Sequence, residues 1–312
     1  MTHAHFALKR IVLGLLCIGL TVARIAYAAS PVAVDGGDIV IERLPGVIAT
    51  PLLENALPAA IKTSKVLKIA TDLTPPISFH ADDGALIGID ADIAKALGII
   101  LNVNVQMTDV GAGAAIVPSI LSGRYDMTLS GINDDPALEQ QVDVVDYMYD
   151  ATTIMTLGGN PHGIKSMSDL CGKVVAVPVG TFQERLVEAE SKRCSTDTIH
   201  IMAIPKMPDV LQAVRAGRAD ATVNGYATSV YTTRHQVGNG TGLAALPNVR
   251  LAEGYLGILV AKNNKALRDS VVAALQQMVD SGAYSAILKK WDLDPLAVHT
   301  VKVNDAQQLT AN

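Results

Sequence analysis

Short apolar runs alternate with amphipathic segments over most of the chain, beginning with Val66–Thr71, an apolar and β-branched run that ends shortly before a Pro-Pro turn. Further strands are predicted at Val103–Met107, Asp126–Leu129, Val174–Val177, His200–Ala203 and Ala221–Val223. Helices are predicted at Ala91–Gly98, Ala114–Leu121, Phe182–Ser191, Pro208–Ala216 and Lys265–Ser281. This alternation is typical of βαβ units, so it predicts an α/β fold with mostly parallel sheets.

Three segments depart from this alternation. Extended apolar runs at Thr152–Leu157 and Tyr255–Val260 interrupt the alternation of strand and helix. Residues 29–56 mix Pro, Gly and short apolar runs without a period, which predicts a leader with little regular structure.

Residues 1–28 have the pattern of a secretory signal peptide. Lys9 and Arg10 precede an apolar run, and residues 26–28 offer a small-x-small cleavage site. The run is shorter than the about 20 apolar residues that a membrane anchor needs, and the two leucines before Cys17 are not the small residues expected before a lipidated cysteine. We therefore expect cleavage near Ala28 and export to the periplasm.

Length and charge narrow the function further. Removing the three basic residues of the signal leaves 22 basic and 30 acidic side chains, a formal net charge of −8. A nucleic acid is therefore not an expected partner. The mature chain of about 280 residues exceeds the usual size of a single core and predicts two lobes.

The exported chain keeps an even pair of cysteines, Cys171 and Cys194. An oxidising compartment favours a disulfide between them, and two inert buried thiols are the alternative. The chain has no Cys-x-x-Cys spacing and its histidines are scattered singly, so no metal and no cofactor are expected.

Five sequence blocks, in their order and spacing, resemble the polar amino-acid family of extracellular substrate-binding proteins that feed ABC importers. The blocks are LKIATDLTPPISF (Leu67–Phe79), GALIGIDADIAKALG (Gly84–Gly98), ILSGRYDMTLSGI (Ile120–Ile132), DLCGKVVAVPVGTFQE (Asp169–Glu184) and AGRADATVNG (Ala216–Gly225). The resemblance covers roughly residues 57–292. It also supports the disulfide, because some members of the family have cysteines at these two positions.

The resemblance implies a two-lobed periplasmic binding protein-like fold, with two mostly parallel sheets joined by two hinge crossovers. Lobe 1 would hold residues 57–154 plus 256–300, lobe 2 would hold residues 155–255, and residues 301–312 would form a C-terminal tail. The ligand would lie in the cleft between the lobes, and closure about the hinge would create the shape that a membrane permease recognises.

Residues after the strands of such a fold are candidates for ligand contact. The resemblance implies that Asp72 meets a cationic group, and that Ser130, Gly131 and Asn133 contact the ligand through hydroxyl, main-chain and amide groups. The alternative for each of these residues is formation of the turn that follows a strand.

The start of the helix predicted from Phe182 is a second candidate. Gly180 and Thr181 precede it, so its unpaired N–H groups could bind a partial negative charge. Thr181 could equally be the cap of that helix. Asp90, at the mouth of another predicted helix, is interpreted as an N-cap outside the site.

Two charged positions of the family are altered. The family places an arginine for the α-carboxylate five residues after Asn133, where this chain has Leu138. It places an aspartate for the α-ammonium five residues after Asp220, where this chain has Gly225. A desolvated charge without its partner costs about 2 to 5 kcal/mol, so the sequence predicts a ligand other than a simple α-amino acid.

These features predict the binding component of an ABC-type importer, a monomer that delivers a small polar solute to its permease and catalyses no reaction. A first alternative is an enzyme, because cyclohexadienyl dehydratases resemble this family, although their chemistry needs cationic groups for the substrate carboxylates. A second alternative is a sensor or docking protein with a degenerate cleft.

Overall fold

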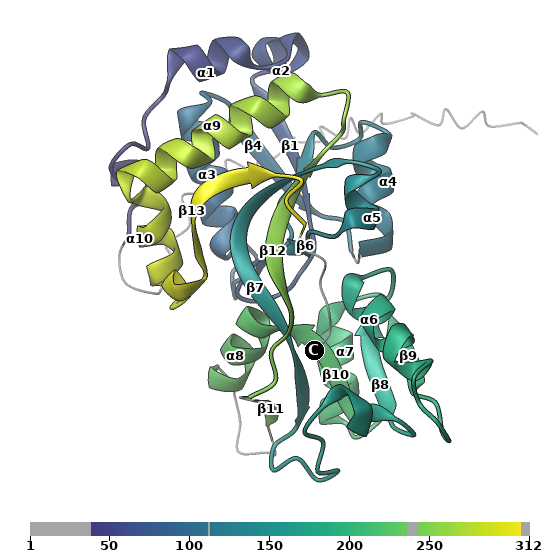
Figure 1. The fold of residues 1–312 in the computed structure, drawn as a ribbon. Helices are drawn as coiled ribbons and strands as arrows, with labels where there is room; N and C mark the ends of the chain where they lie inside the picture. Colours follow the sequence, from purple (N-terminus) through teal and green to yellow (C-terminus); the bar gives the residue numbers. More distant parts are fainter. Residues whose placement is uncertain (1–38, 112, 236–241, 247, 307–312) are drawn as a thin grey trace, which may run out of the picture. The chain divides into compact units, whose positions relative to one another are not determined.

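The computed structural model describes residues 39–111, 113–235, 242–246 and 248–306. The predicted signal peptide, the start of the predicted leader and the last six residues of the predicted tail lie outside the described residues. Within them, the chain forms a two-lobed α/β fold around a mixed sheet (Figure 1).

Lobe 1 is built on β1 (Val66–Thr71), which pairs in parallel with β4 (Asn104–Asp109) and with β5 (Met127–Thr128). Helices α3 (Ile89–Ile100), α9 (Lys265–Ser281) and α10 (Ala283–Lys290) share one large hydrophobic core with these strands. The predicted helix at Lys265–Ser281 is confirmed, and it ends at Gly282 in the left-handed conformation that favours glycine. The smaller elements of this lobe are α2 (Ala59–Ser64), β2 (Phe79–His80), β3 (Leu86–Ile87), η2 (Gly113–Ala115), α4 (Ile116–Leu121), β6 (Ile132–Asn133), α5 (Pro136–Glu139) and η4 (Asp294–Leu296).

Lobe 2 is built on β8 (Val174–Pro178), which pairs in parallel with β9 (His200–Ile204) and with β10 (Ala221–Gly225). Alternate residues of this sheet enter two separate cores, since Val175 and Val177 pack on one face and Ala176 on the other. Because both faces of this sheet are buried, its strands are continuous apolar runs in the sequence. The remaining elements are η3 (Met167–Leu170), α6 (Phe182–Ser191), α7 (Met207–Arg215), α8 (Tyr226–Arg234) and β11 (Leu243–Ala245).

Two long strands connect the lobes. Strands β7 (Asp143–Leu157) and β12 (Leu251–Val260) pair with each other and run side by side through both lobes (Figure 1). Strand β7 also pairs with β10, and β12 with β5, so the two predicted sheets are one continuous sheet of 11 strands. Because the crossovers pass without a break, the predicted lobe boundaries stay a prediction.

The structure differs from the prediction at both ends of the family resemblance. In the predicted leader, η1 (Ile41–Arg43) and α1 (Pro51–Ala56) are helical, and Ile41 and Val47 are buried in the core of lobe 1. The prediction of little regular structure is therefore wrong for this part, whose isolated apolar residues are ordered by packing rather than by a local period. In the predicted tail, residues 301–303 belong to β13 (Ala297–Val303), which pairs with β7.

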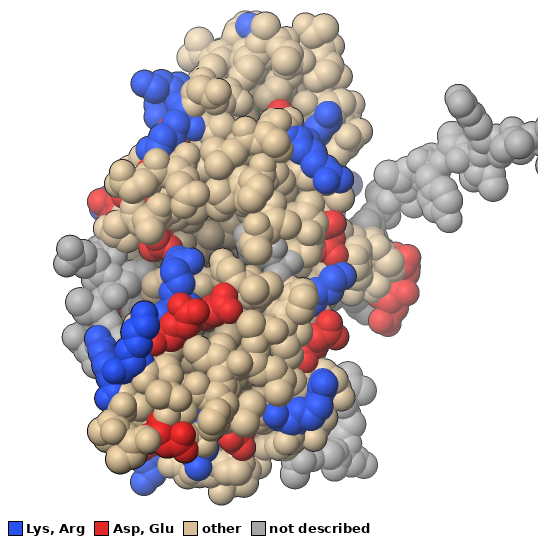
Figure 2. Space-filling view, turned by 90° about the vertical axis from the view of Figure 1, so that its right-hand side faces the viewer, with Lys and Arg blue, Asp and Glu red and all other residues tan. Residues whose placement is uncertain are grey.

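Charged side chains of both signs are interspersed over the face of the molecule in Figure 2. The net negative charge of the chain therefore does not gather into a field of one sign on this face. In the part of the chain that the structure describes, no helix has the length and apolar character needed to cross a bilayer.

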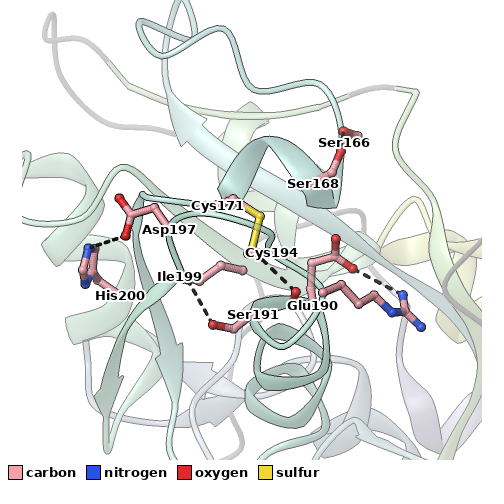
Figure 3. Close-up of a disulfide and its surroundings, with 10 residues drawn as sticks. Ser166, Ser168, Cys171, Glu190, Ser191, Cys194, Asp197, Ile199 and His200 are labelled. Atoms are coloured by element: carbon pink, nitrogen blue, oxygen red, sulfur yellow. Dashed lines mark hydrogen bonds and ion pairs between the residues drawn. A yellow bond between two sulfur atoms is a disulfide. The ribbon is translucent and has the colours of Figure 1, made fainter.

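The predicted disulfide is confirmed. Cys171 follows η3 and Cys194 follows α6, with 1.98 Å between the two sulfur atoms and 5.7 Å between the Cα atoms (Figure 3). The bridge closes a segment with a sequence separation of 23 residues. A loop of this size stabilises a fold by roughly 3 kcal/mol in the chain-entropy model.

Candidate functional site

A cavity of about 530 Å³ lies at the carboxyl ends of strands from both lobes. Asp72 follows β1, Ser130 follows β5, and Asn224 and Gly225 end β10. This volume lies within the roughly 300 to 1,000 Å³ of typical small-molecule pockets. The edge of an α/β sheet where strands end is also where ligands usually bind.

All six predicted contact residues line this cavity. The two positions at which the family's charged residues are replaced, called the altered clamp positions below, line it as well. They are Asp72, Ser130, Gly131, Asn133, Gly180 and Thr181, with Leu138 and Gly225. The structure thus brings together residues from separate segments of the sequence. Their contact with a ligand stays a prediction.

Asp72 and Ser130 form one polar unit on the lobe 1 side. The Ser130 hydroxyl donates to Asp72 Oδ1 at 2.8 Å, and the Asp72 backbone N–H donates to Ser130 Oγ at 3.0 Å. Burial raises the pKa of Asp72 to about 6, and the nearby charge of Asp109 acts in the same direction. Since Asp109 also lines the cavity, this wall favours a positively charged guest.

Helix α6 of lobe 2 contacts lobe 1 directly along one side of the cavity. Gln183 Nε2 donates to the amide oxygen of Asn133 at 3.0 Å, and the Arg185 guanidinium donates to the Asp135 carboxylate. Gly180 has φ of +75°, and a Cβ at this position would lie 2.8 Å from the Ala114 Cβ. Glycine therefore allows α6 to approach lobe 1 this closely.

The predicted anion site at the start of α6 is engaged by the chain itself. Thr181 Oγ accepts from the Glu184 N–H at 3.2 Å and donates to the Pro178 carbonyl at 2.7 Å. The Gly180 N–H donates to the Glu184 carboxylate at 2.6 Å. These bonds are those of a helix cap, which favours the capping alternative over binding of an anion.

The prediction that Asp90 is an N-cap is wrong. Gly88 is the N-cap of α3 without a side-chain bond, and Asp90 lies inside the helix, fully buried. Asp90 Oδ1 accepts from the Tyr147 hydroxyl at 2.7 Å, and burial raises the pKa of Asp90 to about 8. The N-cap prediction considered only residues close to Asp90 in the sequence. The partner of Asp90 is Tyr147, which belongs to the distant strand β7. Asp90 does not line the cavity.

The two altered clamp positions have different surroundings. Leu138 is buried in a small hydrophobic cluster with Ile116 and Val142, which removes its apolar side chain from water. Gly225 faces a carboxylate, because a Cβ at this position would lie 2.7 Å from Asp150 Oδ2. Asp150 belongs to β7 and lines the cavity beside Gly225.

Asp150 is held from the lobe 2 side. Its Oδ1 accepts from the Ala227 N–H at 3.1 Å, and only 6% of the residue is exposed. Burial raises the pKa of Asp150 to about 7, while backbone N–H donors and the charge of Arg250 act in the opposite direction. The carboxyl group therefore titrates near neutral pH.

Sequence reasoning missed Asp150 and Arg185, both of which line the cavity together with Asp135 and Lys206. The cavity therefore has charges of both signs, from positions other than 138 and 225. A signal for Asp150 was present, since it is an acid just before the apolar and hydroxyl-rich run that predicted a crossover. No local signal exists for Arg185, whose side chain is half exposed on α6. Among the described residues, no three His, Cys, Asp or Glu side chains are grouped so that they could hold a metal ion.

The two lobes, the connecting strands and the cavity between strand ends define a periplasmic binding protein-like fold. Residues 67–294 match the family of bacterial extracellular solute-binding proteins, family 3, and the chain belongs to this family. Its members are the binding proteins of amino-acid ABC importers.

Known relatives agree with this assignment. The chain is 27% identical over 222 residues to the arginine-binding extracellular protein ArtP of Bacillus subtilis (strain 168), covering 69% of this chain and 81% of that protein. It is 26% identical over 230 residues to the histidine-binding periplasmic protein of Salmonella typhimurium (strain LT2), covering 72% and 86%. The crystal structure of the ancestral amino acid-binding protein AncCDT-1, described as a precursor of cyclohexadienyl dehydratase, has a TM-score of 0.66 at 28% identity and covers 74% of this chain and 97% of that one.

Proposed function

We propose that this protein is the binding component of an ABC importer and captures a small polar solute that carries a positive charge. The observation that carries this proposal is the charge of the cavity. Four aspartates line it, Asp72, Asp109, Asp135 and Asp150, against Arg185 and Lys206. Arg185 is already paired with Asp135, so the remaining charge is acidic and favours a cationic guest.

The relatives support the same ligand class. The two curated relatives are named for arginine and histidine, and both of these amino acids carry a cationic or protonatable side chain. The expectation of a ligand other than a simple α-amino acid rested on the missing charges at positions 138 and 225, whereas Asp150 and Arg185 provide other charges in the cavity. We therefore include basic α-amino acids among the candidate ligands.

The family supports a setting for this function. The partner would be a membrane permease, the signal peptide would be removed near Ala28, and the protein would act in the periplasm as a monomer. Lobe 1 (residues 57–154 plus 256–300) and lobe 2 (residues 155–255) would close on the solute about β7 and β12.

Thermal unfolding with added ligands tests the proposal. L-arginine, L-histidine and the amine agmatine are compared with L-glutamate and L-glutamine at equal concentration. A ligand present at 100 times its Kd stabilises the folded state by about 2.7 kcal/mol, so we expect a clear rise in melting temperature with cationic ligands only. A rise with L-glutamate but not with the cationic ligands would contradict the proposed charge preference.

One observation favours an enzyme as the second candidate. Asp150 has a pKa of about 7 inside the cavity, which suits a general acid. The acidic cavity, however, disfavours a dicarboxylate such as prephenate. Turnover of prephenate by the purified protein, lost in Asp150→Asn, would reverse this ranking.

A further inference from the structure

The carboxylate of Asp150 occupies the place where a side chain at position 225 would begin. A Cβ on Gly225 would lie 2.7 Å from Asp150 Oδ2, closer than Cβ atoms approach their neighbours in folded proteins. Position 225 is where the family resemblance places the acid for an α-ammonium. The acid is therefore missing from the end of β10, while the carboxylate of an acid from β7 lies directly beside position 225.

The register of the sheet explains how β7 reaches this point. Gly225 is paired with Thr152 in the antiparallel ladder of β10 and β7. Asp150 lies two residues before Thr152, so its side chain is on the same face of the strand. It extends past the last residue of β10, into the cavity that both strands line.

The surroundings of Asp150 are those of a site for a polar group. Oδ1 is fixed by the Ala227 N–H at 3.1 Å, which leaves Oδ2 on the side of Gly225. Nearby, Asn224 Nδ2 and Thr152 Oγ are buried and have no hydrogen-bond partner in the described part of the chain. Asn224 is 2% exposed and lines the cavity. A buried polar atom without a partner is costly, and a polar solute in the cavity would satisfy Asn224 Nδ2.

We infer that Asp150 binds the ammonium group of the solute, in place of an acid at position 225. The inference rests on the proposed function and names the specificity-determining residue of its site. A glycine at position 225 is then part of the same arrangement, because only a residue without a Cβ leaves room for the carboxylate.

The test measures binding of L-arginine and Nα-acetyl-L-arginine by calorimetry to the exported protein. Asp150→Asn keeps an oxygen that accepts from the Ala227 N–H but removes the charge. Truncating one partner of a buried charge pair costs several factors of ten, so we expect L-arginine to bind at least about 30-fold more weakly to this variant. Nα-acetyl-L-arginine, which lacks the ammonium, should bind weakly to both proteins.

A double variant moves the acid from position 150 to position 225. Asp150→Gly combined with Gly225→Asp removes the close contact and restores a carboxylate at the end of β10, so binding of L-arginine should recover most of the loss. Asp146→Asn is the matched control, since Asp146 is a buried acid on the same strand that does not line the cavity. It should bind L-arginine like the unaltered protein.

The outcomes separate the two proposals. If the unaltered protein binds L-arginine and Asp150→Asn binds it equally well, the inference is wrong and the proposed function stands. If the unaltered protein binds none of L-arginine, L-histidine and agmatine, the proposed function is contradicted and the inference falls with it. Cooperative unfolding of each variant confirms that a loss of binding is not a loss of fold.

Discussion

Strand β7 carries two buried aspartates, Asp146 and Asp150, in opposite surroundings. Asp146 is fully buried, and its neighbours Asp134, Glu139 and Asp305 are all acidic. Asp150 accepts a backbone N–H and faces the cavity. Burial raises the pKa of both groups to about 7.

The difference shows that burial alone does not identify a binding group. Asp146 has acidic neighbours, so its neutral form stabilises the fold and its charged form does not. Asp150 has N–H donors and an open side, so a cationic guest can compensate its charge. Strand β7 thus carries one acid that is buried among other acids, Asp146, and one that lines the cavity and can bind a cationic group, Asp150.

The close approach of Asp150 to Gly225 can be tested by adding a side chain at position 225. In Gly225→Asp the new Cβ would collide with Asp150 Oδ2, and two carboxylates would share one buried site. We expect the free energy of unfolding to fall by about 3 kcal/mol, from overpacking and like-charge repulsion. Denaturant unfolding measures this, and Asp150→Gly in the same chain should restore most of the loss. A stable single variant would show that the two residues are not in contact.

A third buried acid, Asp90, is also held by a residue of β7. The Tyr147 hydroxyl on β7 donates to the buried carboxyl group of Asp90, whose other oxygen has no partner in the described structure. Tyr147→Phe removes the donor, and we expect the free energy of unfolding to fall by about 2 kcal/mol. Tyr149→Phe is the control. It also removes a hydroxyl bond, to the Tyr255 hydroxyl at 2.7 Å, but Tyr149 is 40% exposed and water can replace the lost partner, so stability should change by less than about 0.5 kcal/mol. Equal effects of the two substitutions would contradict this view of Asp90.

The buried acids predict how stability depends on pH. Burial raises the pKa of Asp90 to about 8 and that of Asp146 to about 7, and burial together with the neighbouring Asp146 and Glu139 raises that of Asp134 to about 9. Above the unfolded pKa of about 4, the folded state therefore keeps protons that the unfolded state has lost. Stability is greatest below that value and is lost as the pH rises through the folded pKa values.

Urea unfolding between pH 5 and pH 8.5 measures this dependence. We expect the free energy of unfolding to fall as the pH rises. In Asp146→Asn one of these groups no longer titrates, so below neutral pH the fall should be less steep by about 1.4 kcal/mol per pH unit. A free energy of unfolding that rises over this range in the unaltered protein would contradict the prediction.

The smallest effect is expected for the ion pair between the lobes. Arg185 is about half exposed, at 51% of its side chain, so its pair with Asp135 is screened by solvent. Arg185→Gln should lower the free energy of unfolding by about 0.5 kcal/mol, with Arg193→Gln as a control for an exposed pair within lobe 2. A loss above about 2 kcal/mol would indicate that this pair is desolvated and stabilises the contact between lobes.

Local patterns predicted the elements whose burial follows a simple period. Val66–Thr71, Phe182–Ser191 and Lys265–Ser281 have the predicted bounds. The pattern failed where packing between distant segments decides the outcome. Residues 41–56 are helical in part because they contact α9, as the 2.7 Å bond from Gln277 to the Gly46 carbonyl shows.

The α/β order of elements, the family, the pairing of Cys171 with Cys194 and the loops that line the cavity could be predicted from residue types and their spacing along the chain. The charges that face the cavity could not be predicted in this way, because they come together only in the folded protein. In the sequence, Leu138 and Gly225 replace the two charged residues with which the family holds an α-amino acid. In the structure, the register of β7 against β10 places the Asp150 carboxylate beside position 225. A charge acts through distance in space, and two residues that are 75 positions apart in the sequence meet only after the sheet has formed.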